Sequence, residues 1–175
     1  TIALAPRGGF LHAPDMYMEK IAVGPTARGA IDINESPTVN LQRVADAKKC
    51  YIEDLTVVIL DRPRHDKIVD EIRRAGARIH LITDGDVAPA IAAAVEGSGV
   101  DMLLGIGGAP EGVLAAAALK CMGGDMQGRL VFMNDEERER AKGMGIDDFD
   151  KVYQCNEMAN GDVVFAATGV TSGEL

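Results

Sequence analysis

The chain has 175 residues, of which 47% are hydrophobic and 26% are charged. This length and composition predict one folded domain with a sizeable core and argue against a disordered chain. A formal net charge of −9 at pH 7 excludes a general nucleic-acid-binding protein, which would need a basic face. No stretch reaches the roughly 18 continuous apolar residues of a membrane span, so we expect no membrane partner.

The N-terminus and the cysteines indicate what kind of chain this is. The segment TIALAPRGGF (1–10) lacks the basic region and long apolar core of a secretory signal. It also lacks an initiator methionine, and TIALA resembles the middle of a β-strand, so we expect a fragment of a longer protein. The three cysteines lie far apart without CxxC spacing, which favours reduced thiols in a cytoplasmic protein. The three histidines show no metal-ligand pattern either.

Helices are expected first, at 13–24 and 37–49, with Asp15 and Thr38 as N-caps. The rest of the chain alternates between strand and helix. The expected strands are 55–60, 78–83, 100–106, 128–133, 149–154 and 162–170. The expected helices between them are 64–77, 86–99, 110–124 and 135–145. Strands separated by helices of this length predict parallel pairing, and therefore an α/β fold with a mostly parallel sheet flanked by helices.

Polar or glycine-rich turns follow three of these strands. They are DRPRH (61–65), TDGDV (83–87) and GIGGAPEG (105–112). In an open α/β sheet, ligands bind beyond the carboxyl ends of the strands. Because the three strands are expected to be successive and parallel, we expect their turns to share one edge of the sheet.

The glycine turn is not a dinucleotide-binding motif. Gly105 and Gly107 would require a third glycine at position 110, where Pro110 stands, and no GK[ST] sequence follows. One interpretation is a tight strand-to-helix turn, with Glu111 at the positive end of the helix. The other is a carboxylate that faces a glycine-lined gap and binds Mg²⁺ or Mn²⁺, which prefer carboxylate oxygens. The residues alone leave both open.

The sequence LITDGDV matches the DxDx[TV] pattern of haloacid dehalogenases, in which Asp84 would accept a phosphoryl group covalently. The alternative is an Asp-Gly turn with a capping aspartate. The dehalogenase hypothesis also needs a second acidic pair at a strand end. GIDDFD (145–150) has the acids but follows a glycine-rich helix end rather than an apolar strand.

Basic and aromatic side chains provide a further set of candidates. Arg62 and Arg64 flank a proline, and guanidinium groups suit phosphate oxygens, although two solvated arginines would look the same. DMYMEK (15–20) contains Tyr17 and Lys20, but a Met/Tyr stripe is more often part of a core.

Five motifs in this order resemble the class II fructose-1,6-bisphosphatases of bacteria, some of which also act on sedoheptulose 1,7-bisphosphate. They are APDMYMEKIAVGP, RPRHD, DGDV, GIGGAPEGV and VVFAATGVTSGEL, and the resemblance spans roughly residues 3–175. It implies the layered α/β sandwich of the lithium-sensitive sugar phosphatase superfamily. It also implies hydrolysis of the 1-phosphate of fructose 1,6-bisphosphate, in gluconeogenesis or the Calvin cycle, with Mn²⁺ or Mg²⁺ as cofactor.

The resemblance also assigns site residues. Glu111 matches a metal ligand, and no residue of this chain matches a catalytic one. The positions that match substrate-binding residues of the family are Tyr17, Arg62, Pro63, Arg64, Asp84, Gly85, Asp86 and Gly108. Asp84 and Asp86 would accept hydrogen bonds from sugar hydroxyls.

The chain departs from the family pattern in what it lacks. Family members are longer, and their other metal ligands lie upstream, the last of them in a DPxEGT-type motif that is absent here. We therefore expect residues 1–175 to form a single α/β unit, the substrate-side, C-terminal half of a phosphatase, inactive by itself. The parent is expected to be a cytoplasmic homodimer or homotetramer. The competing hypotheses are a dehalogenase-type phosphatase and a non-catalytic sugar-phosphate-binding fragment.

Overall fold

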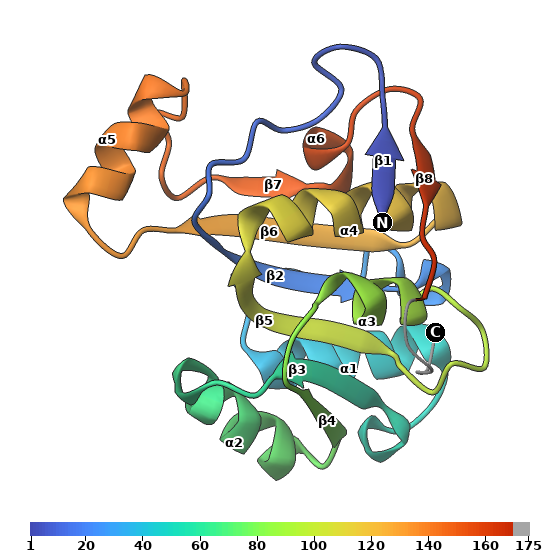
Figure 1. Ribbon diagram of the computed structural model, residues 1–175. Coiled ribbons are helices and arrows are strands. Elements are labelled where there is room, and N and C mark those ends of the chain that lie inside the picture. The colour runs from blue at the N-terminus through green and yellow to red at the C-terminus, as the bar shows by residue number, and fades with distance from the viewer. Residues whose placement is uncertain (170–175) are drawn as a thin grey trace.

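The computed structural model describes residues 1–169, which form two β-sheets and six α-helices (Figure 1). The larger sheet has the strand order β4-β3-β5-β2-β6-β7. Its strands are β2 (Tyr17–Val23), β3 (Thr56–Leu60), β4 (Arg78–Ile82), β5 (Met102–Gly108), β6 (Asp125–Val131) and β7 (Val152–Gln154). The helices are α1 (Pro37–Lys48), α2 (Asp66–Ala75), α3 (Val87–Ala92), α4 (Ala109–Met122), α5 (Asp135–Gly143) and α6 (Cys155–Met158).

The large sheet is mixed, and the expectation of a mostly parallel sheet is wrong. Strand β3 pairs in parallel with β4 and β5, as the strand–helix alternation predicts. Strand β2, however, lies between β5 and β6 and is antiparallel to both. Strand β7 is antiparallel to β6. The α/β class is therefore confirmed. The sheet is mixed because β2 lies antiparallel between β5 and β6, and β7 lies antiparallel to β6.

The segment expected to be a helix at 13–24 is instead the central strand β2. Met18 and Ala22 face one layer of the core, and Ile21 and Val23 face the other. Because a strand buried on both faces carries apolar residues at consecutive positions, it loses the simple alternation that identifies a half-buried strand. Asp15 consequently caps no helix and lies exposed before the strand.

Helices cover both faces of the large sheet (Figure 1). One core cluster joins the sheet to α1 and α2, and a second joins it to α3, α4 and α6. A two-stranded sheet, β1 (Ile2–Leu4) with β8 (Val164–Ala166), packs on the outer side of α4. Covered on both sides, α4 buries four consecutive alanines, 115–118, whose small side chains permit close packing. The expected N-terminal strand thus forms, and its partner is β8.

Local sequence explains most helix ends. Helix α2 stops at Gly76, which adopts φ = 99°, a conformation that glycine reaches without strain. Helix α4 begins with Pro110 in its first turn and ends at Gly123. The cap of α1 is Ser36, whose hydroxyl accepts a hydrogen bond from the Val39 N–H, and not Thr38 as expected.

Thr38 has a tertiary partner instead: its backbone N–H and its hydroxyl both donate to Glu71 of α2. Within residues 1–169, no helix combines the length and apolar character needed to cross a membrane. The last six residues of the VVFAATGVTSGEL motif lie outside the described range.

Candidate functional site

The three polar turns meet at one edge of the sheet, as the sequence predicts. Strands β3, β4 and β5 run in the same direction, so their carboxyl ends share an edge. Arg62 Nη2 donates a hydrogen bond of 2.7 Å to the Thr83 carbonyl, which ties the turn after β3 to the turn after β4. Arg64 donates through Nε and Nη2 to the Ile106 carbonyl, at 3.2 and 2.7 Å, which ties the same turn to β5.

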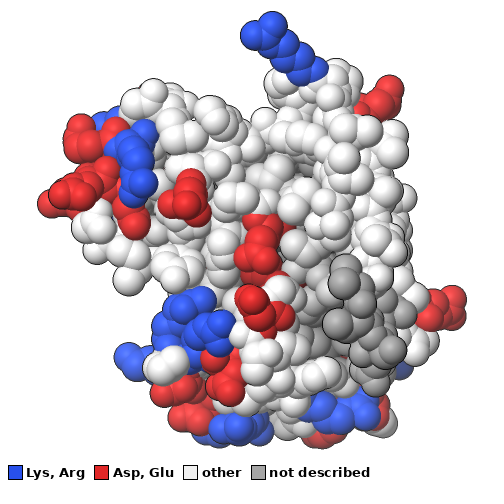
Figure 2. Space-filling view, in the orientation of Figure 1, with Lys and Arg blue, Asp and Glu red and all other residues white. Residues whose placement is uncertain are grey.

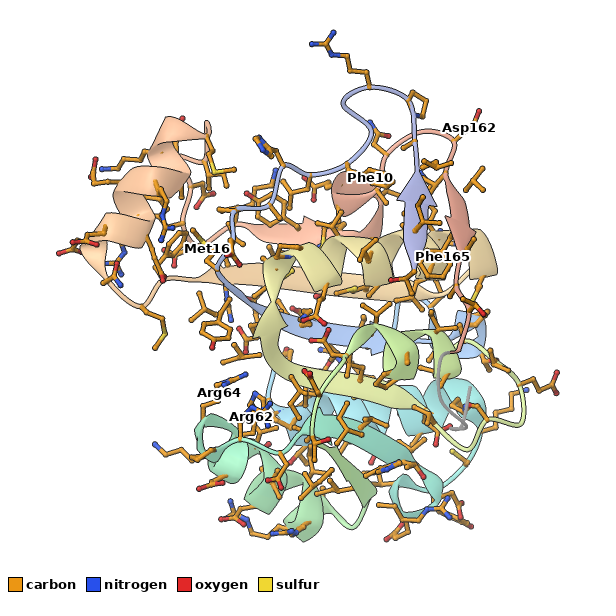
Figure 3. All side chains as sticks on the ribbon, in the orientation of Figure 1. Phe10, Met16, Arg62, Arg64, Asp162 and Phe165 are labelled. Carbon is orange, nitrogen blue, oxygen red and sulfur yellow. The ribbon has the colours of Figure 1, made fainter. Side chains whose placement is uncertain are left out.

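Arg64 and Tyr17 are both exposed at this edge. Pro63 starts a 3-10 turn (Pro63–His65) that directs both arginines along the strand ends (Figure 3). The Arg64 guanidinium lies 4.9 Å from the centre of the Tyr17 ring, a cation–π contact. Tyr17 is 39% exposed and is the register partner of Gly108 in the β2–β5 ladder. Arg64 uses two of its five N–H groups on Ile106, so the others remain available to an anion.

The DGD turn presents its two aspartates differently. Asp84 is exposed, and its Oδ1 accepts the N–H of Gly85, which adopts φ = 74°. Asp86 is only 2% exposed, at the start of α3. The family resemblance implies sugar contacts from both aspartates, but only Asp84 lies where a ligand from solvent could reach it.

Asp86 forms a buried ion pair with Lys20. Asp86 Oδ2 contacts Lys20 Nζ, and the lysine is 1% exposed in the centre of β2. Lys20 Nζ also donates to the Gly108 carbonyl at 2.9 Å. Burial lowers the pKa of Lys20, and the negative charges of Asp86 and Glu111 oppose this effect. The pairing stabilises both charges where neither could be buried alone.

Two glycines make room for this pair. A Cβ at Gly107 would clash with Asp86 Oδ2 and lie 3.0 Å from Lys20 Nζ. A Cβ at Gly112 would lie 3.2 Å from Lys20 Cδ and 2.7 Å from the Met18 sulfur. Two glycines of the glycine-rich turn therefore leave the space that the buried Lys20 side chain occupies.

Glu111 lies in the first turn of α4, against Gly108. Its carboxylate lies directly against this glycine: a Cβ at Gly108 would lie 2.9 Å from Glu111 Oε2. Burial raises the pKa of Glu111, and the nearby Asp86 carboxylate raises it further, while Lys20 lowers it. A cation bound here would favour the ionised carboxylate.

The described residues do not form a complete metal site. Among residues 1–169, no group of three or more His, Cys, Asp and Glu side chains is arranged to hold a metal ion. Glu111 fits a metal ligand in chemistry and placement, but Mg²⁺ needs about six oxygen ligands and Mn²⁺ prefers the same hard donors. This chain can therefore contribute one protein ligand at the glycine turn.

His65 is a structural member of the edge that sequence reasoning did not single out. The ring is completely buried. Its Nε2 accepts the Ile106 N–H at 2.8 Å, so Nδ1 carries the proton and donates to the Leu60 carbonyl at 2.7 Å. Burial lowers the pKa of His65, and the two neighbouring arginines add to this effect. The histidine is thus a neutral bridge between β3 and β5.

Lys20 has a larger part in this edge than its place in the DMYMEK segment indicates. Read on a helix, it is one polar residue in a Met/Tyr stripe. Read on a strand, it shares a face with Met18 and Ala22, and a lysine on an apolar strand face is a clear sign of a buried partner.

Charged side chains of both signs are exposed near these strand ends. Figure 2 shows acidic side chains at the centre of the face and a basic group to the lower left of them, where Figure 3 places Arg62 and Arg64. A cavity of about 460 Å³ borders Asp84 and Gly85, on the α3 side of β4.

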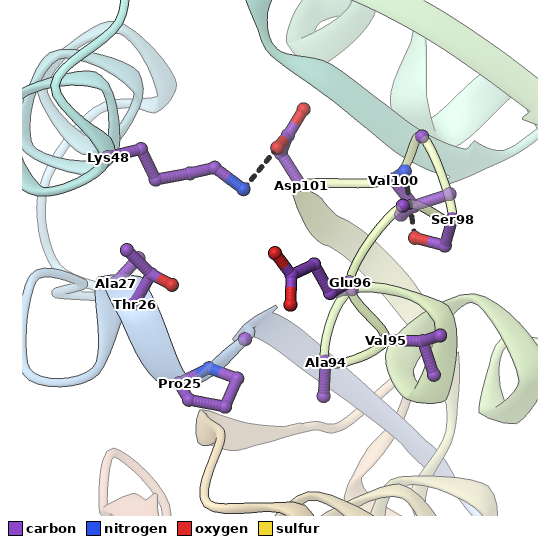
Figure 4. A pocket seen from close by; sticks show the side chains of 14 residues that line it. Pro25, Thr26, Ala27, Lys48, Ala94, Val95, Glu96, Ser98, Val100 and Asp101 are labelled. Atoms are coloured by element: carbon purple, nitrogen blue, oxygen red, sulfur yellow. Dashed lines mark hydrogen bonds and ion pairs between the residues drawn. The ribbon is translucent and has the colours of Figure 1, made fainter.

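A second cavity, of about 470 Å³, lies at the amino end of β5, away from the strand ends of the site (Figure 4). It is lined in part by Glu96 and by the ion pair of Lys48 with Asp101, whose Nζ and Oδ1 are 2.5 Å apart.

Comparison with known proteins identifies the family of this chain. The family model described as "Bacterial fructose-1,6-bisphosphatase, glpX-encoded" matches residues 1–175. The chain belongs to this family. Curated relatives include proteins of Synechococcus sp. (strain JA-3-3Ab) and Synechocystis sp. (strain ATCC 27184 / PCC 6803 / Kazusa), each 46% identical, and of Microcystis aeruginosa, 47% identical.

Each of these relatives is named D-fructose 1,6-bisphosphatase class 2/sedoheptulose 1,7-bisphosphatase. The matches cover 100% of this chain but 54% of each relative. The chain therefore spans about half the length of the curated relatives it matches, and family membership applies to this half.

Proposed function

We propose that this chain forms the substrate-side half of a class II bisphosphatase that hydrolyses the 1-phosphate of fructose 1,6-bisphosphate, and that sedoheptulose 1,7-bisphosphate is an alternative substrate. The observation that carries the proposal is the convergence of an exposed arginine–tyrosine pair and a glycine-cradled carboxylate at Gly108. The first suits a sugar phosphate, and the second suits a divalent cation. Family membership is consistent with both.

The residues of this chain bind and orient the substrate in this proposal. Arg64 donates to a phosphate group, with its guanidinium already fixed by the Ile106 carbonyl and the Tyr17 ring. Asp84 accepts hydrogen bonds from sugar hydroxyls, and Gly85 and Gly108 let the sugar approach the backbone. Arg62 and Pro63 keep the arginine turn in place.

Glu111 would be the residue of this chain that holds Mn²⁺ or Mg²⁺. The ion, when bound, supplies charge neutralisation of the phosphoryl group and activation of water. The remaining ligands belong to the other half of the enzyme in this proposal. From the family resemblance, we also propose a cytoplasmic homodimer or homotetramer.

The test is the kinetics of the Arg64→Ala variant of the intact phosphatase. Loss of a charge-assisted hydrogen bond costs about 1.5–3 kcal/mol, so we expect KM for fructose 1,6-bisphosphate to rise about 10- to 100-fold. The matched control is Arg73→Ala, an exposed arginine of α2 that pairs with Asp70. An unchanged KM in Arg64→Ala would remove Arg64 from the site. No phosphate release by the unmodified enzyme would favour a sugar-phosphate-binding protein.

A further inference from the structure

Lys20 occupies an unusual position for a lysine. It lies in the middle of the central strand β2, 1% exposed, between the two turns that carry Asp86 and Gly108. Its Nζ contacts the Asp86 carboxylate and the Gly108 carbonyl. Gly107 and Gly112 leave the space that its side chain fills. Burying an ion pair is no general route to stability, because desolvation offsets most of the attraction. The pair therefore calls for an explanation other than folding alone.

The contacts of Gly108 connect this pair to the proposed metal ligand. The Gly108 carbonyl accepts a hydrogen bond from Lys20 Nζ, and the Glu111 carboxylate packs against the same glycine, so that a Cβ at Gly108 would lie 2.9 Å from Glu111 Oε2. A continuous set of contacts thus runs from Asp86 through Lys20 and Gly108 to Glu111. These contacts join the turn after β4 to the turn after β5. The two strands do not pair with each other, because β3 lies between them.

We propose that Lys20 is a positioning residue, which with Asp86 fixes the Gly108 turn so that Glu111 and the sugar-binding turn keep the geometry that turnover requires. This inference rests on the proposed function. It gives Asp86 a role beneath the site in place of a direct contact with the sugar, in agreement with its 2% exposure. Asp86 Oδ1 has no hydrogen-bond partner among the described residues, so the pair leaves one buried acceptor unsatisfied.

The experiment compares three variants of the intact phosphatase with fructose 1,6-bisphosphate and saturating Mn²⁺. Lys20→Met keeps an unbranched side chain, one atom shorter, and removes the amine. We expect kcat to fall about 10- to 100-fold, as for other residues that orient a metal ligand, while KM changes less than about threefold. Lys48→Met is the matched control, because it breaks the Lys48–Asp101 pair at the opposite end of β5. It should keep its kcat whatever it loses in melting temperature.

The third variant, Lys20→Met with Asp86→Asn, removes the unpaired carboxylate that the single change leaves buried. We expect it to recover melting temperature but not kcat. Recovery of kcat together with melting temperature would show that the pair serves folding alone and would overturn the proposal. A raised KM with unchanged kcat would overturn it as well, because that result means direct substrate contact. A folded Lys20→Met variant with normal kcat would do the same.

Hydrogen exchange separates this proposal from the proposed function. Backbone amide exchange over residues 103–112 is measured in the intact protein without substrate. The Gly108 amide, whose residue is held by Lys20 through its carbonyl, should exchange at least about tenfold faster in Lys20→Met than in Lys48→Met. Equal exchange would refute the positioning role even in an active enzyme. Faster exchange in a protein that releases no phosphate would refute the bisphosphatase function and leave the positioning of Glu111 supported.

Discussion

Replacing His65 with alanine tests whether a side chain holds the carboxyl end of β3 in the sheet. The register of β3 with β5 joins Val57 to Met102 and Val58 to Leu103. Beyond that point, the His65 ring connects the strands by accepting the Ile106 N–H and donating to the Leu60 carbonyl. The arginine turn follows directly, so the placement of the candidate site depends on this bridge.

The magnitude follows from what the alanine variant leaves behind. Two backbone groups lose their partners in a region where the His65 ring is completely buried. Each buried unsatisfied group costs about 1–3 kcal/mol, and the volume of the missing ring adds a cavity cost. We expect a loss of about 3–5 kcal/mol in the free energy of unfolding, a large share of the roughly 5–15 kcal/mol typical of a domain.

Urea unfolding followed by far-ultraviolet circular dichroism measures this loss. His65→Gln is the control, because a carboxamide can both donate and accept, and we expect it to recover about half of the lost hydrogen-bond energy. A loss below about 1 kcal/mol in His65→Ala would show that the ladder, and not the histidine, holds the end of β3.

The same residue predicts a pH dependence. Because burial lowers the pKa of His65 in the folded protein, the unfolded chain binds this proton more readily. Stability should therefore fall as pH drops below about 6.5, the pKa of an unperturbed histidine. Above about pH 7.5 the histidine is neutral in both states, so this loss of stability should be absent. The stability advantage of the unmodified protein over His65→Gln should shrink between about pH 7.5 and 5.5. An advantage that stays constant over this range would refute a neutral, buried His65.

Three other predictions concern the site. In the intact phosphatase, Asp84→Asn should weaken substrate use without changing any covalent intermediate; detection of a phosphoryl group on Asp84 would instead support the dehalogenase hypothesis. Gly107→Ala should cost about 1–3 kcal/mol, measured by urea unfolding, because its Cβ clashes with Asp86. Gly143→Ala, where a Cβ meets no atom within 4 Å, should be neutral or stabilising. A loss of stability in Gly143→Ala equal to that in Gly107→Ala would contradict the packing argument. The 175-residue chain alone should release no phosphate from fructose 1,6-bisphosphate with Mn²⁺, because Glu111 is a single ligand; metal-dependent turnover by a monomer would refute this.

Sequence patterns predicted much of the edge that carries the site. Apolar runs located β3, β4 and β5, and parallel strands separated by helices required their carboxyl ends to meet. The arginine turn and the glycine turn were therefore placed correctly relative to each other. The contacts that fix them were not predictable, because they depend on backbone carbonyls such as those of Thr83 and Ile106, which no residue type identifies.

By itself, the sequence determined the features that short-range chemistry controls. Helix α2 ends before Gly76 because glycine tolerates a positive φ, and Pro110 fits the first turn of α4 because proline lacks an N–H that this turn leaves unpaired. Only the tertiary structure decided that residues 17–23 form a strand and that Lys20 pairs with Asp86. Burial on both faces erased the local periodicity of that strand, and the partner of a buried charge is chosen by the strand order, which places distant segments side by side.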